Sequence, residues 1–253
     1  MLKAEHITVT IQDRTLVHQC SFEVEPHDFL VIIGPNGAGK TTLIKAIMQN
    51  VASSGQVTFW GRDMRAMKAA EIARHIAVLT QQHHMAYAYS AAQVVELGRY
   101  AHIASFWKGM NETDRQAVEE AMAQVGIADL RERSVLTLSG GELQRVFLAQ
   151  VLAQTPQIMI LDEPANQLDI QYQLRVFDLI KGWVQAQDRA VVAVLHDLNF
   201  AFAYATKVLL MNEGRTYAYG TPEEVLTREN LLEVYKVDVC AWIQTLLARW
   251  QDK

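Results

Sequence analysis

Residues 34–42, "GPNGAGKTT", have the types and spacing that suit phosphate binding. Four residues separate Gly34 from Gly39, Lys40 and Thr41, and small residues let backbone N–H groups close around phosphate oxygens at a helix N-terminus. Lys40 would neutralise the β and γ phosphates, and Thr41 would offer its hydroxyl to Mg²⁺. The alternative is a glycine-rich turn with an exposed lysine. The stretch lies directly after an apolar run and before helical spacing, which favours the phosphate loop.

Two acidic residues and a histidine follow two other apolar runs. Asp162 and Glu163 come after the run 158–161, where one carboxylate could hold Mg²⁺ through water and the other could orient or deprotonate an attacking water. His196 follows the run 190–195 and could contact a γ phosphate. Taken alone, the acids could be ordinary surface-turn residues and the histidine could be structural.

The stretch "LSGGELQR", residues 138–145, contains a serine with no base beside it. Ser139 therefore has no local means of becoming a nucleophile. Ser139 followed by two glycines and Glu142 also has the pattern of a helix N-cap.

The elements that must position these residues can be read from apolar spacing. The runs 29–33, 158–161 and 190–195 predict buried strands of a parallel sheet covered on both faces, with polar residues gathered at the carboxyl ends. Residues 90–154 contain no comparable run and predict three helices, at 91–100, 112–126 and 141–154. The segment 222–237 predicts further amphipathic helix on the core.

Composition limits the classes of protein that fit. The 253 residues can bury a sizeable core, and no apolar run reaches the roughly 18 residues of a membrane helix. A net charge of −5 and a pI near 5.9 argue against broad nucleic-acid binding. Cys20 and Cys240 have no metal or redox spacing. We expect a soluble cytosolic chain without a signal segment.

The motifs "GPNGAGKTT", "LSGGELQR", "IMILDEP", "NQLD" and "VLHD" occur in the order and spacing of ATP-binding cassette ATPases. The chain resembles the subunit that powers a membrane transporter. The resemblance implies a single α/β domain over 1–253: a P-loop NTPase core with a mainly parallel sheet, an N-terminal antiparallel β portion and a helical subdomain. Its core would comprise 1–84 and 155–253, and the helical subdomain 85–154.

The resemblance also implies roles for individual residues. The Walker A loop would bind ATP through Gly34, Pro35, Asn36, Gly37, Ala38, Gly39, Lys40, Thr41 and Thr42. Asp162 would end Walker B and, with Thr41 and Gln81, hold Mg²⁺. Glu163 would be the catalytic base, His196 the switch histidine on the γ phosphate, and Asp169 the aspartate of the dimer-contact loop. Gln81 would also reach the attacking water, and Gln82 is the competing register for this glutamine.

In this family the signature sequence caps the ATP bound to the other subunit. Ser139, Gly140 and Gly141 would approach the γ phosphate, with the positive end of the following helix directed at it. A single cassette per chain then predicts a two-fold homodimer with two ATP molecules at its interface. A lone copy should be nearly inactive.

The chain departs from the family pattern at the position that would stack on the base of the nucleotide. Cassettes usually place an aromatic residue before the P-loop, yet residues 1–21 contain no Phe, Tyr or Trp, and the nearest register gives Val9 or Ile11. A missing stack is worth about 0.5–1.5 kcal/mol, or about tenfold in affinity at most. We expect ATP binding to survive with weak base discrimination, which comparable hydrolysis of ATP and GTP would support.

The kind of cassette is indicated by "VVELGRYAH", "DEPANQLDI" and the segment 191–235, which look most like importers of iron chelates, haem and vitamin B12. Such a subunit works on the cytoplasmic face of the membrane with two permease subunits and a solute-binding protein on the other side. Its permease contact would lie around 81–100, including Tyr87 and Tyr89, although these residues could simply pack the insertion on the core. A zinc or manganese importer and a soluble non-transport cassette ATPase remain alternatives, and the solute cannot be read from the chain.

Overall fold

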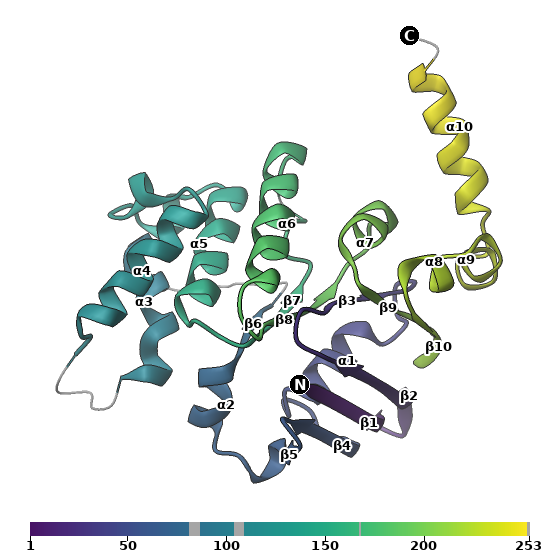
Figure 1. The fold of residues 1–253 in the computed structure, drawn as a ribbon, viewed down its shortest axis with the longest axis horizontal. Helices are drawn as coiled ribbons and strands as arrows, with labels where there is room; N and C mark the ends of the chain where they lie inside the picture. Colours follow the sequence, from purple (N-terminus) through teal and green to yellow (C-terminus); the bar gives the residue numbers. More distant parts are fainter. Residues whose placement is uncertain (81–86, 104–108, 167, 252–253) are drawn as a thin grey trace. The chain divides into compact units, whose positions relative to one another are not determined.

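The computed structural model describes residues 1–80, 87–103, 109–166 and 168–251 (Figure 1). Two compact units make up the chain. The first unit comprises Met1–Val24, Leu30–Asp63 and Val194–Lys253, and the second comprises Glu25–Phe29 and Met64–Ala193. The predicted phosphate loop and His196 belong to the first unit, whereas Walker B and the signature belong to the second.

An antiparallel sheet occupies part of the first unit. Its strands are β1 (Leu2–Ile11), β2 (Arg14–Val24), β4 (Ser54–Phe59) and β5 (Arg62–Asp63), in the order β2-β1-β4-β5. In β1, buried Leu2, Ala4, Ile7 and Val9 face the core between more exposed residues. This spacing is typical of a sheet with one covered face, and it confirms the predicted antiparallel portion.

A second group of strands in the first unit carries the phosphate loop. Strand β3 (Phe29–Ile33) runs parallel to β9 (Lys207–Asn212), which pairs antiparallel with β10 (Arg215–Gly220). Every residue of β3 is buried, as predicted from its unbroken apolar run. Helix α1 (Lys40–Ile47) begins at the end of the loop and packs on β1 and β2 through its apolar face.

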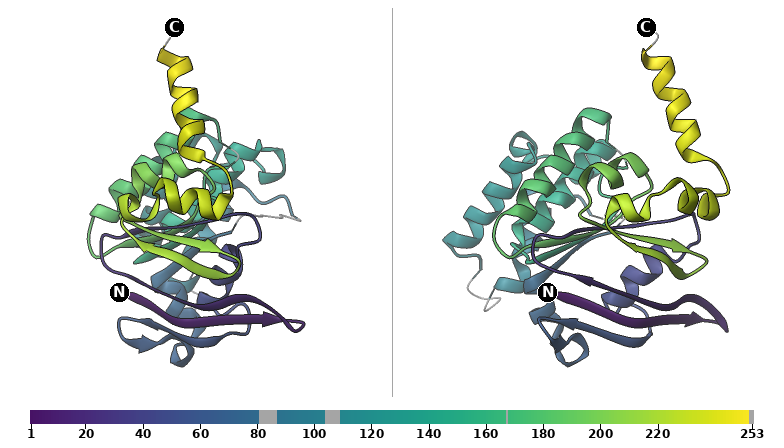
Figure 2. Two further views of the ribbon diagram at one scale, coloured as in Figure 1. Left: turned by 90° about the vertical axis from the view of Figure 1, so that its right-hand side faces the viewer. Right: turned by 45° about the vertical axis from the view of Figure 1, so that its right-hand side comes forward.

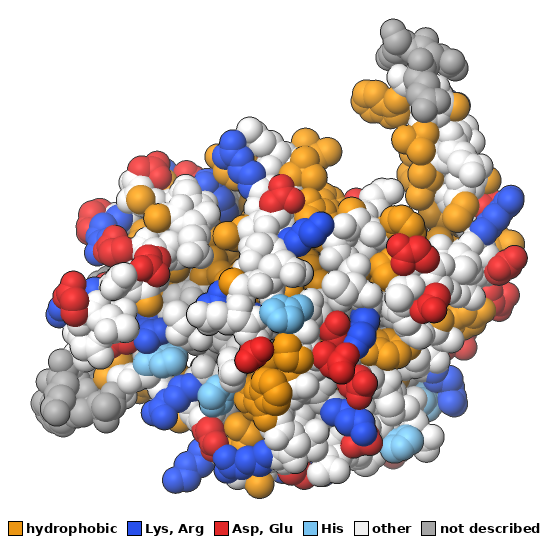
Figure 3. All heavy atoms as spheres, in the orientation of Figure 1, with side chains coloured by type: hydrophobic (Ala, Val, Ile, Leu, Met, Phe, Trp, Pro, Cys, Tyr) orange, Lys and Arg blue, Asp and Glu red, His pale blue; other side chains and the backbone are white. Residues whose placement is uncertain are grey.

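Four helices complete the first unit. They are α7 (Leu198–Tyr204), α8 (Pro222–Val225), α9 (Arg228–Tyr235) and α10 (Val239–Gln251). Val225, Leu231 and Val234 are buried, so the predicted amphipathic segment packs on the core through α8 and α9. Helix α10 contacts α9 and carries exposed Trp242, Leu247 and Trp250. Hydrophobic side chains are visible along this helix in Figure 3.

The second unit has its own strands, β6 (Ile76–Leu79), β7 (Ile158–Asp162) and β8 (Ala190–Val194), in the order β8-β7-β6. Strands β6 and β7 are parallel, with Ile76 opposite Ile158. Every residue of β7 and β8 is buried, which agrees with strands covered on both faces. The predicted strands 158–161 and 190–195 are confirmed to within a residue.

The second unit also contains helices, drawn in colours from blue through teal to green in Figure 2. Residues 91–100, 112–126 and 141–154 form α3 (Ala91–Glu96), α4 (Glu112–Gln124) and α5 (Gly140–Ala153), which pack against one another. The first predicted helix differs, because it continues beyond Glu96 as the 3₁₀ helix η2 (Leu97–His102). The other helices among the described residues of this unit are η1 (Met64–Ala66), α2 (Ala69–His75), η4 (Ala128–Leu130), η5 (Val135–Thr137) and α6 (Ile170–Gln185).

The predicted subdomain boundaries at 85 and 154 stay predictions. Among the described residues, none of the helices combines the length and apolar character that crossing a bilayer requires.

Candidate nucleotide site

The loop between β3 and α1 has the backbone of a phosphate cradle. Gly34, Gly37 and Gly39 have φ angles of 152°, 81° and 95°. At Gly39 an added Cβ would stand 2.7 Å from the carbonyl oxygen of Leu16, so this position has no room for a side chain and requires a left-handed backbone. The result is a strand, a glycine-rich turn and a helix N-terminus, the context that phosphate loops require.

Lys40 is folded into this loop. Its Nζ donates hydrogen bonds to the carbonyl oxygens of Gly34, at 2.7 Å, and Pro35, at 3.0 Å, and only 6 % of the residue is exposed. A buried ammonium must be compensated by oxygen acceptors. The lysine is therefore held at the centre of the loop, where an incoming phosphate could exchange with the carbonyls.

Two further elements of the first unit support the loop. The N–H of Gly214, in the β9–β10 turn, donates to the carbonyl of Ala38 at 3.1 Å. Tyr235, at the end of α9, is hydrogen-bonded to the backbone of Gly34. Burial raises the pKa of Tyr235 to about 12, and the bond to Gly34 offsets part of that effect. Tyr235 was not singled out from the sequence, because only the fold brings residues 34 and 235 together.

The two positions proposed for a nucleobase contact differ in the structure. Val9 is completely buried within β1, where it pairs with Val17. Ile11, at the end of β1, is 43 % exposed. Of the two, only Ile11 presents surface to a ligand.

His196 lies beyond the end of β8, in an exposed position. The N–H of Leu195 donates to the carbonyl of Ile32 at 3.2 Å, just before the phosphate loop begins at Gly34. Within the first unit, the histidine thus follows a segment held to the strand that leads into the loop. This placement agrees with a γ-phosphate contact, which stays a prediction.

In the second unit, Asp162 is the last residue of β7 and Glu163 follows it, and they are 4 % and 7 % exposed. Glu163 has a φ of 56°, a left-handed conformation that is uncommon for a residue with a side chain. Its carboxylate accepts a hydrogen bond from the side-chain amide of Asn166. Asn166 lies within "NQLD" but was not assigned a role, since sequence spacing does not show that the turn folds back on Glu163.

The loop after Glu163 is held by both neighbouring helices. The Gln144 amide on α5 donates to the carbonyl of Pro164 at 3.0 Å, and the Gln173 amide on α6 donates to that of Ala165 at 3.2 Å. Asp169 is the N-cap of α6 and accepts from the N–H of Tyr172 at 3.0 Å. Buried Gln144 thereby ties the signature helix to the Walker B turn, a link that sequence reasoning missed.

The signature serine forms a capping box. Ser139 accepts from the N–H of Glu142 at 3.3 Å, and its own N–H and hydroxyl both donate to Glu142 Oε2 at 2.8 Å. These bonds, the backbone one first, hold the pKa of Glu142 below its ordinary value. The predicted N-cap is confirmed. To donate to a phosphate, the hydroxyl must turn away from Glu142.

A groove of about 850 Å³ opens in the second unit. Its mostly apolar walls come from α2, α3, η2 and the segments beside them, and they include Ala73, Arg74, Tyr89, Glu96, Leu97 and Tyr100. Tyr87 is 70 % exposed and packs edge-on against Tyr89, with ring centroids 6.2 Å apart. The proposed glutamines Gln81 and Gln82 lie outside the described residues.

The structure therefore places the candidate residues in two sets. The first unit joins the phosphate loop to the segment that carries His196, and the second joins Glu163, the Asp169 loop and the signature helix. Together these features define a nucleotide-binding cassette.

Comparison with known proteins gives the family. The ABC transporter family, by its sequence model, matches residues 17–166. The chain is 40 % identical over 238 residues to the hemin import ATP-binding protein HmuV of Gloeobacter violaceus, covering 90 % of this chain and 85 % of that protein. It is 37 % identical over 209 residues to the cobalamin import ATP-binding protein BtuD of Halobacterium salinarum, covering 82 % and 52 %. The chain belongs to the ABC transporter family.

A solved structure extends the likeness to three dimensions. An inward-facing metal-chelate type ABC transporter matches with a TM-score of 0.80 and 27 % identity, over 94 % of this chain and 89 % of that chain. The predicted fold class is confirmed, since solved ATP-binding cassettes share the fold. The chain spans about half the length of several curated relatives that it matches.

Proposed function

We propose that the chain is the ATP-hydrolysing subunit of an ABC importer for a metal chelate of the iron-siderophore, haem or cobalamin type. The observation that carries the proposal is the cradle between β3 and α1, where positive-φ glycines surround the Lys40 ammonium. Such a cradle suits the triphosphate of ATP. The match to the hemin import relative covers 85 % of that protein and supports the importer assignment.

Each proposed site residue has a role in ATP hydrolysis that follows from the chemistry of its side chain. Lys40 exchanges its bonds to the loop carbonyls for the β and γ phosphates and neutralises their charge. Glu163 orients and deprotonates the attacking water, and Asn166 holds its carboxylate in place. His196, together with Gln81, completes the contacts to the γ phosphate and the water.

The metal that we propose is Mg²⁺. Asp162 would offer it a carboxylate oxygen and Thr41 a hydroxyl oxygen, and oxygen ligands of this kind suit the ion. Together with Gln81 they would hold it. When bound, the ion would neutralise phosphate charge as ATP is cleaved.

The signature completes the site in trans. Ser139, Gly140 and Gly141 stand at the amino end of α5, where the partial positive charge of the helix suits a phosphate. We infer that this end, with Asp169, meets ATP held by a second copy, so that two copies form two composite sites. ATP closes the homodimer and hydrolysis opens it.

The movement would be passed to two permease subunits, with a solute-binding protein acting on the other side. The groove on the second unit is the docking place that we propose for a permease helix, because its walls are apolar and carry Tyr89 and Tyr100. The chain would thus work at the cytoplasmic face of the membrane.

The proposal is tested with a tagged chain purified from membranes with its co-purifying subunits. We expect the complex to hydrolyse ATP and Lys40→Ala and Glu163→Gln each to abolish hydrolysis. Glu163→Gln should still bind ATP and dimerise. Cells deleted for the gene should lose chelate uptake and regain it with the wild type alone.

Other outcomes would point to the alternatives. Loss of zinc or manganese uptake in place of chelate uptake would contradict the proposed cargo. Purification on DNA or ribosomes without membrane subunits would contradict the transporter assignment.

A further inference from the structure

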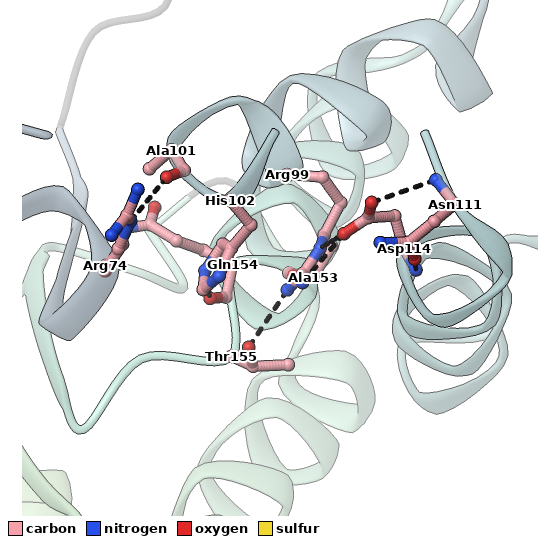
Figure 4. A network of polar contacts seen from close by, with 9 residues as sticks. All are labelled: Arg74, Arg99, Ala101, His102, Asn111, Asp114, Ala153, Gln154 and Thr155. Atoms are coloured by element: carbon pink, nitrogen blue, oxygen red, sulfur yellow. Dashed lines mark hydrogen bonds and ion pairs between the residues drawn. The ribbon is translucent and has the colours of Figure 1, made fainter. Parts of the chain in front are cut away.

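The second unit contains a buried ion pair away from the candidate catalytic residues. Arg99 on η2 and Asp114 on α4 are only 5 % and 2 % exposed. Arg99 Nε and Nη2 lie 3.0 Å and 2.9 Å from Asp114 Oδ1 (Figure 4). A buried charge pair persists only when its remaining donors and acceptors are also satisfied.

The other branch of Arg99 caps the signature helix. Its Nη1 donates to the carbonyl of Ala153, at 2.8 Å, and to Thr155 Oγ1, at 2.9 Å. Ala153 is the last residue of α5. Because the final carbonyls of a helix lack partners within it and carry partial negative charge, a guanidinium is well matched to this end.

Thr155 adopts an unfavourable backbone conformation at this point. Its φ is 48°, in the left-handed region that glycine or asparagine usually occupies at a helix end. A β-branched residue there is a genuine outlier. The Arg99 bond to the Thr155 hydroxyl gives the threonine a specific role that glycine could not fill.

Neighbouring contacts fix the same end of α5. His102 Nε2 lies 2.9 Å from the carbonyl of Gln154, and the Gln154 amide donates to the carbonyls of Ile76, at 3.0 Å, and Ala73. Gly98 lies so close to the carbonyl of Gln150 that a side chain at 98 would collide with it. The 3₁₀ segment η2 thus packs directly on the last turns of α5.

The same elements form the groove. Ala73 and Arg74 on α2 and Leu97, Tyr100 and Ala101 on η2 line it. Arg74 Nε donates to the carbonyl of Ala101 at 2.8 Å, which joins the two walls. A ligand that shifts these walls must therefore move the cluster that holds the end of α5.

Helix α5 connects this cluster to the candidate catalytic residues. Its 14 residues span about 21 Å. Ser139 stands at the far end, and Gln144 contacts the Pro164 carbonyl next to Glu163. A closely packed helix moves as a unit. A displacement of the carboxyl end of α5 would therefore also displace its amino end.

We propose that Arg99, His102, Asp114, Gln154 and Thr155, the Arg99 cluster, couple the groove to the signature. Permease docking in the groove would shift α5 through this cluster and set Ser139 and the Glu163 loop for hydrolysis. The inference rests on the proposed function, because it requires a permease subunit in the groove. Arg99 and Thr155 are positioning residues, since neither lines the groove nor reaches ATP.

The test compares two substitutions at Thr155. Thr155→Gly removes the hydroxyl and suits the left-handed backbone, whereas Thr155→Asn also suits that backbone and keeps a side-chain oxygen. Relief of the left-handed backbone strain opposes the loss of the bond to Arg99, so both variants should fold with close to the wild-type stability. ATP hydrolysis is measured for the complex purified from membranes and for the isolated chain, together with KM for ATP and the urea midpoint.

We expect Thr155→Gly to lower hydrolysis by the complex at least about tenfold, the effect of losing one hydrogen bond to a charged group. The isolated chain should keep its hydrolysis rate, KM and urea midpoint. Thr155→Asn should restore the rate of the complex.

Three outcomes would overturn the inference. The complex of Thr155→Gly could work at the wild-type rate, or the isolated variant could lose activity in the same proportion, which would indicate a purely structural role. If the wild-type complex is no faster than the isolated chain, permease control itself is absent, and the proposed function fails together with the inference.

Discussion

The two ends of helix α5 are built in opposite ways. At the amino end, Ser139 is exposed, and its bonds run to Glu142, three residues along the chain. At the carboxyl end, Arg99 is buried and contacts residues 15 to 56 positions away. The amino end is capped by hydrogen bonds to a residue nearby in the sequence and stays exposed. The carboxyl end is held by contacts with residues that are distant in the sequence. The proposed contact of the amino end with ATP held by a second copy would require that end to stay exposed, whereas an end that anchors the helix can be buried.

The largest effect is expected when the buried ion pair at the carboxyl end of α5 is broken. Asp114→Ala leaves the Arg99 guanidinium without its carboxylate, so we expect the free energy of unfolding to fall by about 3–5 kcal/mol, measured in urea. Glu119→Ala, which removes the exposed partner of Arg131, is the matched control and should cost at most about 1 kcal/mol. Equal losses in the two variants would contradict the contrast between a buried and an exposed pair.

The next largest effect is expected on ATP hydrolysis when the exposed amino end of α5 is changed. Ser139→Arg places a bulky side chain where the partner's γ phosphate is proposed to bind. We expect ATP hydrolysis by the complex to fall by about a hundredfold or more, as for loss of a transition-state donor. Gln116→Arg adds the same charge to an exposed face of α4 and should leave the rate unchanged. Full activity of Ser139→Arg would rule out the shared site.

A smaller effect is expected for the capping box as a structural device. Ser139→Ala should reduce the free energy of unfolding by about 1 kcal/mol, the usual worth of an N-cap. Thr221→Ala removes the equivalent cap of α8 and provides the comparison, because both helices begin with the same box. A loss as large as that of Asp114→Ala would mean that the amino end is not the weakly held one.

The smallest expected effect is a difference in the pH at which the two ends of α5 lose their contribution to stability. Burial, followed by the Arg99 charge, lowers the pKa of His102 below 6.5. The unfolded chain then binds the proton more readily, so stability is lost as pH falls below about 6.5. At the other end Glu142 has a pKa below 4.5, so its contribution disappears only in stronger acid. Lowering the pH from 7.5 to 5.5 should reduce the urea midpoint of the wild type, and His102→Gln should lessen that reduction.

Asp114 responds to acid with the same sign as Glu142. Burial opposes its ionisation, yet the bonds from Asn111 and Arg99 keep its pKa below 3.8. Its stabilising effect is present above that pH and is lost as the pH falls through the lower folded value. The pH 5.5 measurement therefore reports on His102 without interference from this carboxylate.

Much of the fold could be predicted because its signals are local. The unbroken apolar runs of β3, β7 and β8 and the spacing of the phosphate loop lie within a few residues of one another. Helix 91–100 was predicted as one element, but the close packing of Gly98 on α5 accompanies its change to a 3₁₀ helix. Periodicity alone does not carry that information.

Residue types at fixed short spacing were enough to predict the phosphate loop, the two acids at the end of β7 and the cap of α5. Chain folding, in contrast, sets the contacts by which Asn166 holds Glu163, Gln144 ties the signature helix to the Walker B turn, and Arg99 closes the end of α5. Each of these is a hydrogen bond whose partner is chosen by chain folding, and a buried polar group takes whichever partner the packing brings within reach.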